Sequence, residues 1–248
     1  MPVYFIRSEQ IDQNQVHLDK NLQHHLRNVL RLKVGESILL VDEHPKRYEA
    51  RVTASHPHPI ALSIESETLP PLQNSPTIRL AVAFIKKDKM DWLVQKATEL
   101  GISSFTPLIT ERTVIRPEMK NTLHQQTRWE KIAREAAQQS CQWRIPHIEA
   151  PLPFETLLSE KNHDTFQVIC TERHVSLPEQ TNIRNAISGK KRGTILIGPE
   201  GGWTSSEKNR AGTAGFSPIS LGEHILRTET AALAILSILQ YESNLWKS

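Results

Sequence analysis

The hydrophobic positions of the chain follow two different patterns on either side of residue 72. Before it, short β-prone runs are separated by turn residues, which is typical of strands. These runs are Val3–Arg7, Ser37–Val41, Tyr48–Thr53 and Ile60–Ile64. One helix is expected at about Asn21–Leu30, where leucine and valine recur at three- and four-residue spacing. Short strands with one helix predict a small β-barrel domain over residues 1–72.

The second pattern begins after Ser66–Thr77, whose three prolines and small polar residues indicate a linker. Buried-type strands are expected at Leu80–Ile85, Ile102–Ile109, Phe166–Cys170, Thr194–Ile197 and Ile219–Leu221. Amphipathic helices are expected between and after them, at Asp91–Leu100, Arg128–Ser140, Glu179–Ile187, Ser206–Ala214 and Glu229–Tyr241. Strands that alternate with helices predict an α/β domain with a mainly parallel sheet over residues 73–248.

Composition excludes several classes of protein. The 248 residues include 38% hydrophobic and 23% charged residues, which is typical of a globular protein and not of a disordered chain. The two cysteines, Cys141 and Cys170, cannot form a disulfide framework or complete a structural zinc site, and we expect no metal. Apolar runs are far shorter than the ~18 residues of a membrane span, and the first ten residues do not resemble a signal peptide. A cytoplasmic location without a membrane partner is therefore expected.

The positive charge is concentrated in the middle of the chain. The whole sequence has 30 Lys and Arg against 27 Asp and Glu, a net charge of +3. Residues 1–75 carry 8 basic and 9 acidic residues (8 − 9 = −1), whereas residues 79–144 carry 12 and 7 (12 − 7 = +5). Such a local excess attracts phosphate backbones, although solvated helix faces would give the same composition.

Eight of the ten glycines lie between Gly189 and Gly222. The run from Gly198 to Gly202 follows the strand expected at Thr194–Ile197, and Ser205 and Ser206 are candidate N-caps of the next helix. A second loop, from Leu221 to Thr230, also joins a strand to a helix. Ligands of open α/β sheets bind at such carboxyl edges.

The sequence lacks both phosphate-binding signatures, G-x-G-x-x-G and G-x-x-x-x-G-K-[ST]. Two glycine loops with apolar walls (Ile197, Leu221, Ile225 and Leu226) suit a purine ring better than a polyphosphate. Glycines that serve only as turn residues remain the alternative at this point.

Four stretches, in the same order, resemble one known family. They are HHLRNVLRLKVGE, KKDKMDWLVQKATELGISSFTPLITERTVI, RWEKIAREAAQQSCQWRIPHI, and IGPEGGWTSSE followed by LGEHILRTETAALAIL. The chain is similar through these motifs to the RsmE family of 16S ribosomal RNA uridine N3-methyltransferases, in the SPOUT superfamily. The resemblance covers nearly the whole chain.

The resemblance implies a PUA-like RNA-binding barrel at the N-terminus and a SPOUT-type parallel sheet with a trefoil knot after it. It also implies S-adenosylmethionine as cofactor, a homodimer, and a uridine near the 3′ end of 16S rRNA, within the 30S subunit, as substrate. Carried over by position, the expected cofactor-binding residues are Thr171, Ile197, Gly198, Pro199, Glu200, Gly201, Leu221, Gly222, Ile225, Leu226 and Thr228.

The chemistry at uracil requires removal or stabilisation of the N3 proton, because protonated N3 is a poor nucleophile. A carboxylate could accept the proton, and an arginine could stabilise charge that develops on O2 or O4. The candidates near the cofactor loops are Arg112, Arg227 and Glu229. Alternatively, the two arginines form structural ion pairs, and Glu229 has no catalytic role and stabilises the N-terminus of a helix.

Two other functions are compatible with the sequence. One is a different SPOUT reaction, such as ribose 2′-O methylation or methylation of tRNA. The other is a non-catalytic RNA-binding factor in ribosome assembly that has kept the fold. The N-terminal domain and the RTETA string argue against the first alternative, and the intact glycine loops argue against the second.

Overall fold

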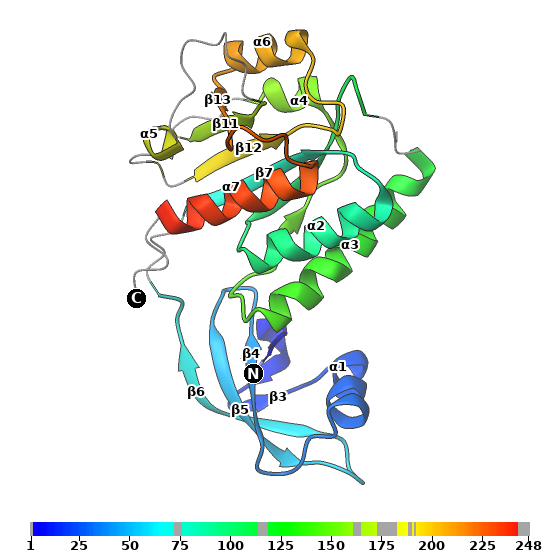
Figure 1. Cartoon of the computed structure of the whole chain (residues 1–248). Coiled ribbons are helices and arrows are strands. Elements are labelled where there is room, and N and C mark those ends of the chain that lie inside the picture. Colours follow the sequence, from blue (N-terminus) through cyan, green and yellow to red (C-terminus); the bar gives the residue numbers. More distant parts are fainter. Residues whose placement is uncertain are drawn as a thin grey trace. The chain divides into compact units, whose positions relative to one another are not determined.

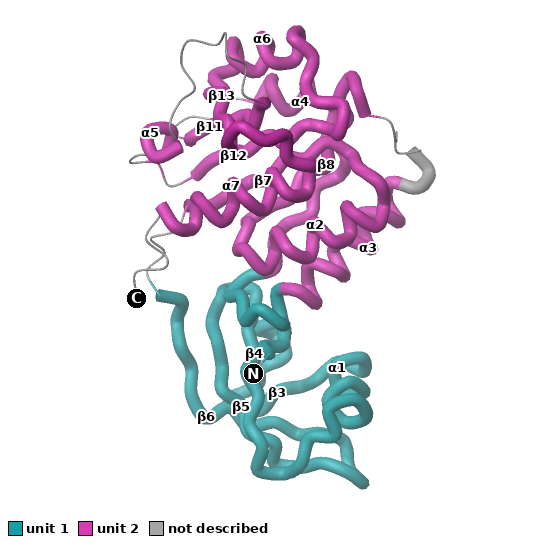
Figure 2. Tube along the Cα trace, viewed as in Figure 1, with its two compact units in different colours: residues 1–72, 137–144 teal, residues 73–136, 145–248 magenta. Residues whose placement is uncertain are grey.

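The computed structural model describes residues 2–71, 76–113, 119–160, 165–172, 183–187, 190 and 192–242. The chain divides into two compact units (Figure 2). Unit 1 comprises residues 1–72 and 137–144, and unit 2 comprises residues 73–136 and 145–248.

Residues 137–144 group with unit 1, whereas the pattern of the sequence assigns them to the second domain. The physical reason lies in Arg47. Its Nη2 donates a hydrogen bond to the Cys141 carbonyl at 2.8 Å, and its guanidinium lies 3.8 Å from the centre of the Trp143 ring. A cation over an indole face is attracted by the ring quadrupole, so these contacts tie the segment to the sheet of unit 1.

Unit 1 is built on a six-stranded sheet of order β1-β4-β5-β6-β3-β2 (Figure 1). Its strands are β1 (Val3–Phe5), β2 (Ile11–Asp12), β3 (Gln15–Val16), β4 (Ser37–Val41), β5 (Arg47–Ala54) and β6 (Ala61–Thr68). Strand β1 pairs with β4 in parallel, and the other neighbours are antiparallel. The expected linker is therefore shorter at its start, because Ser66–Thr68 belong to β6. Linker residues 72–75 lie outside the described residues, and closure of the sheet into a barrel stays a prediction.

The predicted helix of unit 1 is present as α1 (Lys20–His24), followed by a π-helical turn, η2 (His25–Val29). The Asp19 side chain caps α1 by accepting a hydrogen bond from the Leu22 backbone N–H at 2.8 Å. Leu26 is fully buried in the core of this unit and Leu22 packs against that core, whereas Val29 and Leu30 are exposed. The hydrophobic spacing of the sequence therefore indicates only part of the inward face. A short 3₁₀ helix, η1 (Ser8–Gln10), precedes β2.

Unit 2 is built on a sheet in which every pair of neighbouring strands is parallel, as predicted. The strand order is β10-β8-β7-β12-β11-β13, with β9 also paired to β8. The strands are β7 (Thr77–Ala83), β8 (Ser104–Ile109), β9 (His147–Ile148), β10 (Leu152–Pro153), β11 (Phe166–Cys170), β12 (Arg192–Ile197) and β13 (Ser217–Ile219). The sequence pattern misses β9 and β10, which have two residues each, and predicts β13 two residues too late.

Helices cover both faces of this sheet (Figure 1). They are α2 (Lys87–Glu99), α3 (Met119–Gln139), α4 (Phe154–Leu158), α5 (Ile183–Ile187), α6 (Ser205–Thr213) and α7 (Thr228–Glu242). On one face, Leu80 and Val82 pack with residues of α2, α3 and α7; on the other, Ala81 packs with residues of α4 and α6. This two-sided burial explains why the central strands are almost entirely apolar.

Two further findings concern the helices. The helix expected at Glu179–Ile187 is seen over Ile183–Ile187, and residues 179–182 lie outside the described residues. In the described part of the chain, no helix combines the length and hydrophobicity needed to cross a membrane.

Candidate functional site

Three loops meet at the carboxyl ends of β11, β12 and β13 and enclose a cavity of about 320 Å³. They follow Cys170, Ile197 and Ile219, the last residues of the three strands. Neighbouring parallel strands end at one edge of a sheet, so the loops are brought together by the strand order alone. The cavity is lined by Arg112, Cys170, Thr171, Glu172, Ile197, Gly198, Pro199, Gly201, Gly202, Trp203, Ser205, Lys208, Ser220, Leu221, Gly222, His224, Ile225, Leu226, Thr228 and Ala231.

The structure brings together ten of the eleven residues that the sequence nominates for cofactor binding. Gly198 and Gly222, the glycines on which that nomination depends, line the same cavity. The exception is Glu200, which is outside the lining and pairs with Lys89 of α2. Sequence reasoning missed several lining residues, among them Lys208 and Ala231, which lie one helical turn after the lining residues Ser205 and Thr228. That spacing is the signal that could have found them.

The glycine loop after β12 needs glycine for two different physical reasons. At Gly198, a Cβ would lie 2.9 Å from the indole Nε1 of Trp203, closer than side chains approach. At Gly202, the backbone has φ of +68°, in the left-handed region that favours glycine. The backbone of this loop therefore lies so close to the Trp203 indole, and turns so sharply, that residues with larger side chains would disturb it.

Trp203 supports this loop from the interior side. Its side chain is buried, packs against the Phe154 ring at 5.2 Å between ring centres, and donates from Nε1 to the Cys170 carbonyl at 3.0 Å. The indole thereby joins the loop after β12 to the last residue of β11. Burial raises the pKa of the Cys170 thiol to about 12, so the thiol is protonated at neutral pH.

The helix that follows the loop is capped one residue earlier than expected. Thr204, and neither Ser205 nor Ser206, is the N-cap of α6, and it forms a reciprocal capping box with Glu207. Glu207 is fully buried, and its Oε1 also accepts a hydrogen bond from the Glu111 backbone N–H at 2.9 Å. This second bond ties the start of α6 to the loop after β8.

Two side chains hold the glycine loop through its carbonyl oxygens. Thr228, the first residue of α7, donates from Oγ1 to the Gly198 carbonyl at 2.9 Å. Arg112, in the loop after β8, donates from Nη1 to the Gly201 carbonyl at 2.8 Å. The carboxyl edge of the sheet is thus closed by contacts between loops that are far apart in the sequence.

One polar atom in the cavity wall has no partner among the described residues. Thr171 Oγ1 is buried and forms no hydrogen bond with a described residue. A buried hydroxyl without a partner costs free energy, which a ligand with a polar edge would recover. A cavity of this volume, with glycine-rich walls and the Thr171 hydroxyl, fits a nucleoside-type ligand.

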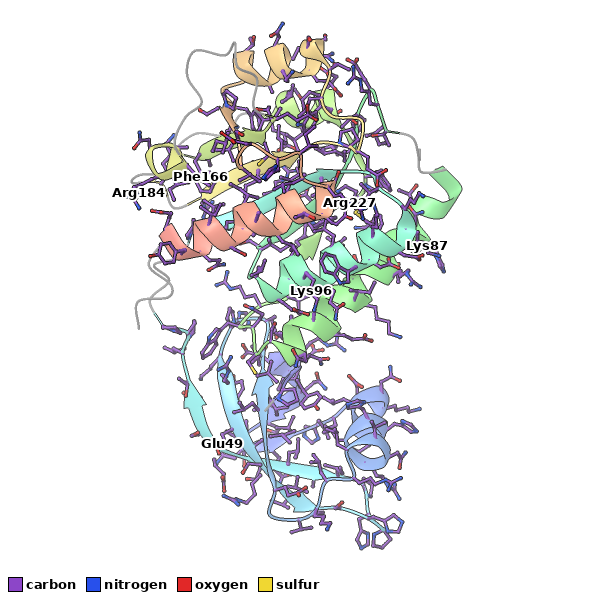
Figure 3. The ribbon with its side chains drawn as sticks, viewed as in Figure 1. Glu49, Lys87, Lys96, Phe166, Arg184 and Arg227 are labelled. Atoms are coloured by element: carbon purple, nitrogen blue, oxygen red, sulfur yellow. The ribbon has the colours of Figure 1, made fainter. Side chains whose placement is uncertain are left out.

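The three candidate catalytic residues take different places. Arg112 lines the cavity. Arg227 is exposed and lies just before α7 (Figure 3). Glu229, in the first turn of α7, is outside the lining; its Oε1 is 3.4 Å from Lys89 Nζ, and its Oε2 is buried without a partner among the described residues. Among all the described residues of the chain, no group of three His, Cys, Asp or Glu residues could hold a metal ion.

Comparison with known proteins identifies this architecture. Residues 73–240 match the RNA methyltransferase domain family, and residues 18–65 match the RNA methyltransferase PUA domain. The ribosomal RNA small subunit methyltransferase E of Synechocystis sp. is 32% identical over 241 residues, which cover 94% of this chain and 75% of that protein. The enzyme of the same name from Bacillus subtilis is 29% identical, covering 90% of this chain and 88% of its own length.

Two solved structures share the whole fold. Ribosomal RNA small subunit methyltransferase E from Neisseria gonorrhoeae, bound to S-adenosylmethionine, is 29% identical with a TM-score of 0.84, and 97% of each chain is covered. A protein of Legionella pneumophila, solved with the bound cofactor SAM, is 28% identical with a TM-score of 0.81, and 96% of each chain is covered.

The fold and the loop cavity define the class of this protein as an RNA methyltransferase with a parallel α/β domain and a PUA domain. Within that class, the chain belongs to the ribosomal RNA small subunit methyltransferase E family.

Proposed function

We propose that the protein transfers a methyl group from S-adenosylmethionine to N3 of a uridine near the 3′ end of 16S rRNA, within the small ribosomal subunit. The observation that carries this proposal is the cavity formed by three loops at the carboxyl edge of the parallel sheet. Family membership supports it, because two relatives with the same fold are solved with this cofactor bound.

The cofactor would lie against the residues nominated from the sequence that line the cavity. Gly198, Gly201 and Gly222 would let backbone groups approach the nucleoside, and Ile197, Leu221 and Leu226 would form its apolar walls. Thr171 would supply a hydroxyl to a polar edge of the ligand. We further propose that these loops form the trefoil knot of the superfamily.

When bound, the cofactor supplies an electrophilic methyl group on a sulfonium. In the proposed step, the N3–methyl bond forms as the sulfur–methyl bond breaks, and the N3 proton passes to a base. Glu229 is our candidate base, because one of its carboxylate oxygens is buried without a partner in the described part of the chain and it follows the cavity-lining Thr228. Arg112 would stabilise charge on the uracil oxygens, and Arg227, which is exposed, would contact the RNA.

The RNA would be held by both units. The PUA match supports unit 1 as an RNA-binding domain, and the +5 charge of residues 79–144 supports affinity for phosphate (12 − 7 = +5). We propose a cytoplasmic homodimer. Large apolar side chains that are exposed on α2 and α7 support a partner surface there: Trp92, Ile238 and Tyr241.

The test is methyl transfer with labelled S-adenosylmethionine, followed by mass spectrometry of rRNA digests. We expect one labelled 3-methyluridine near the 3′ end of 16S rRNA, with assembled 30S particles modified faster than naked rRNA. Label on a ribose 2′-oxygen or on tRNA would establish a different reaction. Binding of cofactor and RNA without transfer would identify a non-catalytic assembly factor instead.

A further inference from the structure

The glycine loop from Gly198 to Gly202 is held from three directions. Thr228 and Arg112 hold two of its carbonyl oxygens from inside the cavity wall. The third contact is an ion pair on the outer side: Lys89 Nζ lies 2.6 Å from Glu200 Oε1, and neither residue lines the cavity. A glycine-rich loop loses more conformational entropy on ordering than other loops do, so each contact that restrains it lowers the cost of binding a ligand.

Lys89 bridges two separate parts of the site. Besides Glu200, its ammonium lies 3.4 Å from Oε1 of Glu229, in the first turn of α7. The hydrogen bond from Lys89 lowers the pKa of the Glu200 carboxyl, and the same bond raises the pKa of the lysine. Both groups therefore stay charged at neutral pH. The bridge joins the glycine loop to α7, the helix whose first residue already holds Gly198.

Glu229 depends on this lysine more than Glu200 does. The Glu229 side chain is 13% exposed against 50% for Glu200, and its second carboxylate oxygen has no partner among the described residues. A largely buried carboxylate that loses its cation is left uncompensated, whereas an exposed one is stabilised by water. Without Lys89, the first turn of α7 would have to move to bring the Glu229 carboxylate to water or to another cation.

We propose that Lys89 is a positioning residue for the cofactor: it fixes the glycine loop against the first turn of α7 and so keeps the cavity in its binding shape. This rests on the proposed function. Glu200, nominated from the sequence as a cofactor contact, would accordingly act through Lys89 and not by touching the ligand.

The experiment measures the Kd of S-adenosylmethionine by calorimetry for the full-length protein and three lysine variants. We expect Lys89→Met to weaken binding about 10-fold and to raise the KM for the cofactor by the same factor, while Lys89→Arg stays within about 3-fold of the original. Lys96→Met is the matched control, since Lys96 lies on the same helix and pairs with Glu99 of that helix (Figure 3). Its Kd should not change.

A double-variant cycle separates positioning from a general loss of structure. Glu200→Gln breaks the same ion pair from the loop side, so we expect it to weaken binding by a similar factor. The double variant Lys89→Met/Glu200→Gln should then be no weaker than Lys89→Met alone, because the two side chains act as one contact. Fully additive losses would overturn the inference.

The remaining outcomes are also decisive. If the unaltered protein does not bind S-adenosylmethionine, the proposed function fails. If it binds and both Lys89→Met and Glu200→Gln bind equally well, only the role of Lys89 fails. If Lys89→Met does not fold, Glu200→Gln decides alone, because Glu200 is half exposed and its replacement leaves α2 intact.

Discussion

The two ends of the parallel sheet in unit 2 differ in how their polar side chains are paired. Towards the amino ends of the strands, Arg79 of β7 has a partner for each nitrogen of its guanidinium. Its Nε donates to Thr106 Oγ1 at 2.9 Å, and its two terminal nitrogens pair with Glu149 and Glu160. Within this cluster, the protein satisfies its own polar groups and leaves nothing for a ligand.

At the carboxyl end, the same sheet leaves space and buried polar atoms that have no partner among the described residues. The cavity lies there, and Thr171 Oγ1 in its wall has no partner among the described residues. The loops are held mainly by bonds to their carbonyl oxygens, such as that from Arg112 to Gly201. The Arg79 cluster thus contributes stability, whereas the cavity at the carboxyl end keeps binding capacity at some cost in stability.

Two glycines of one strand and its loop illustrate the same contrast. At Gly193, near the start of β12, a Cβ would lie 2.2 Å from the ring of Phe166, its partner residue on β11 (Figure 3). There glycine allows tight packing. At Gly198, just after β12, the neighbour is the indole of Trp203, which shapes the cavity. A glycine therefore has a structural or a binding role according to the end of the strand at which it lies.

The largest effect is expected from Arg79→Met. The substitution leaves Glu149 and Glu160 near one another without a cation, and the Arg79 side chain is only 18% exposed. We expect the free energy of unfolding to fall by about 3 kcal/mol, as when one partner of a buried ion pair is removed and the other charge is left uncompensated. The Kd of S-adenosylmethionine should stay within about 3-fold under conditions where the protein is folded. Urea denaturation and calorimetry measure the two quantities.

Arg184→Met is the control for Arg79→Met. Arg184 of α5 pairs with Glu242, but its side chain is 71% exposed (Figure 3). Exposed pairs contribute little, so the loss of stability should be much smaller. Equal losses in the two variants would show that burial does not distinguish these ion pairs.

A smaller and more informative effect is expected from the two glycines. Gly193→Ala should lower the free energy of unfolding by about 2 kcal/mol, because its Cβ must displace the Phe166 ring in a packed interior. Gly198→Ala should instead weaken cofactor binding by about 10-fold, since its Cβ would push Trp203 from the Cys170 carbonyl. The same two measurements apply.

The double variant Gly193→Ala/Phe166→Leu tests the first of these explanations. A smaller side chain opposite the new methyl group should make its loss smaller than the sum of the two single losses. If Gly193→Ala weakens binding more than Gly198→Ala does, the division of roles between the two ends is wrong.

Much of this architecture follows from the sequence, for a physical reason. Buried positions are apolar, and their spacing along the chain differs between strands and helices. This is why the sequence predicts a strand from the continuous apolar run at Leu80–Ile85 and a helix from the spacing of apolar residues in Asp91–Leu100. The glycine run after Thr194–Ile197 predicts a loop near a ligand, because glycine at the end of a buried strand allows close approach of the backbone. The cavity agrees with that prediction.

What the sequence does not predict are the partners of the buried groups. Periodicity does not show that Trp203 contacts Cys170, 33 residues away in the chain, or that Lys89 contacts Glu200, 111 residues away. Strand order is equally hidden, because β7 and β12 have similar apolar patterns whichever neighbour they pair with. Residues 137–144 group with unit 1, where Arg47 contacts them, and no local pattern in the sequence predicts this.

The smallest effect is expected at Thr171, and it should have opposite signs for stability and for binding. Thr171→Val removes the unpartnered hydroxyl and keeps the branched shape. The protein without ligand should be as stable as before or slightly more stable, because a buried polar atom without a bond is lost. Cofactor binding should weaken by about 5-fold, about 1 kcal/mol, the usual contribution of one hydrogen bond.

Thr171→Ser, which keeps the hydroxyl, is the matched control for Thr171→Val and should bind the cofactor within about 2-fold of the original protein. Thermal unfolding and calorimetry on the same samples give both quantities. A loss of stability in Thr171→Val with unchanged binding would mean that the hydroxyl serves the protein itself. The carboxyl end would then be as self-contained as the end at Arg79, and the contrast between the two ends would no longer hold.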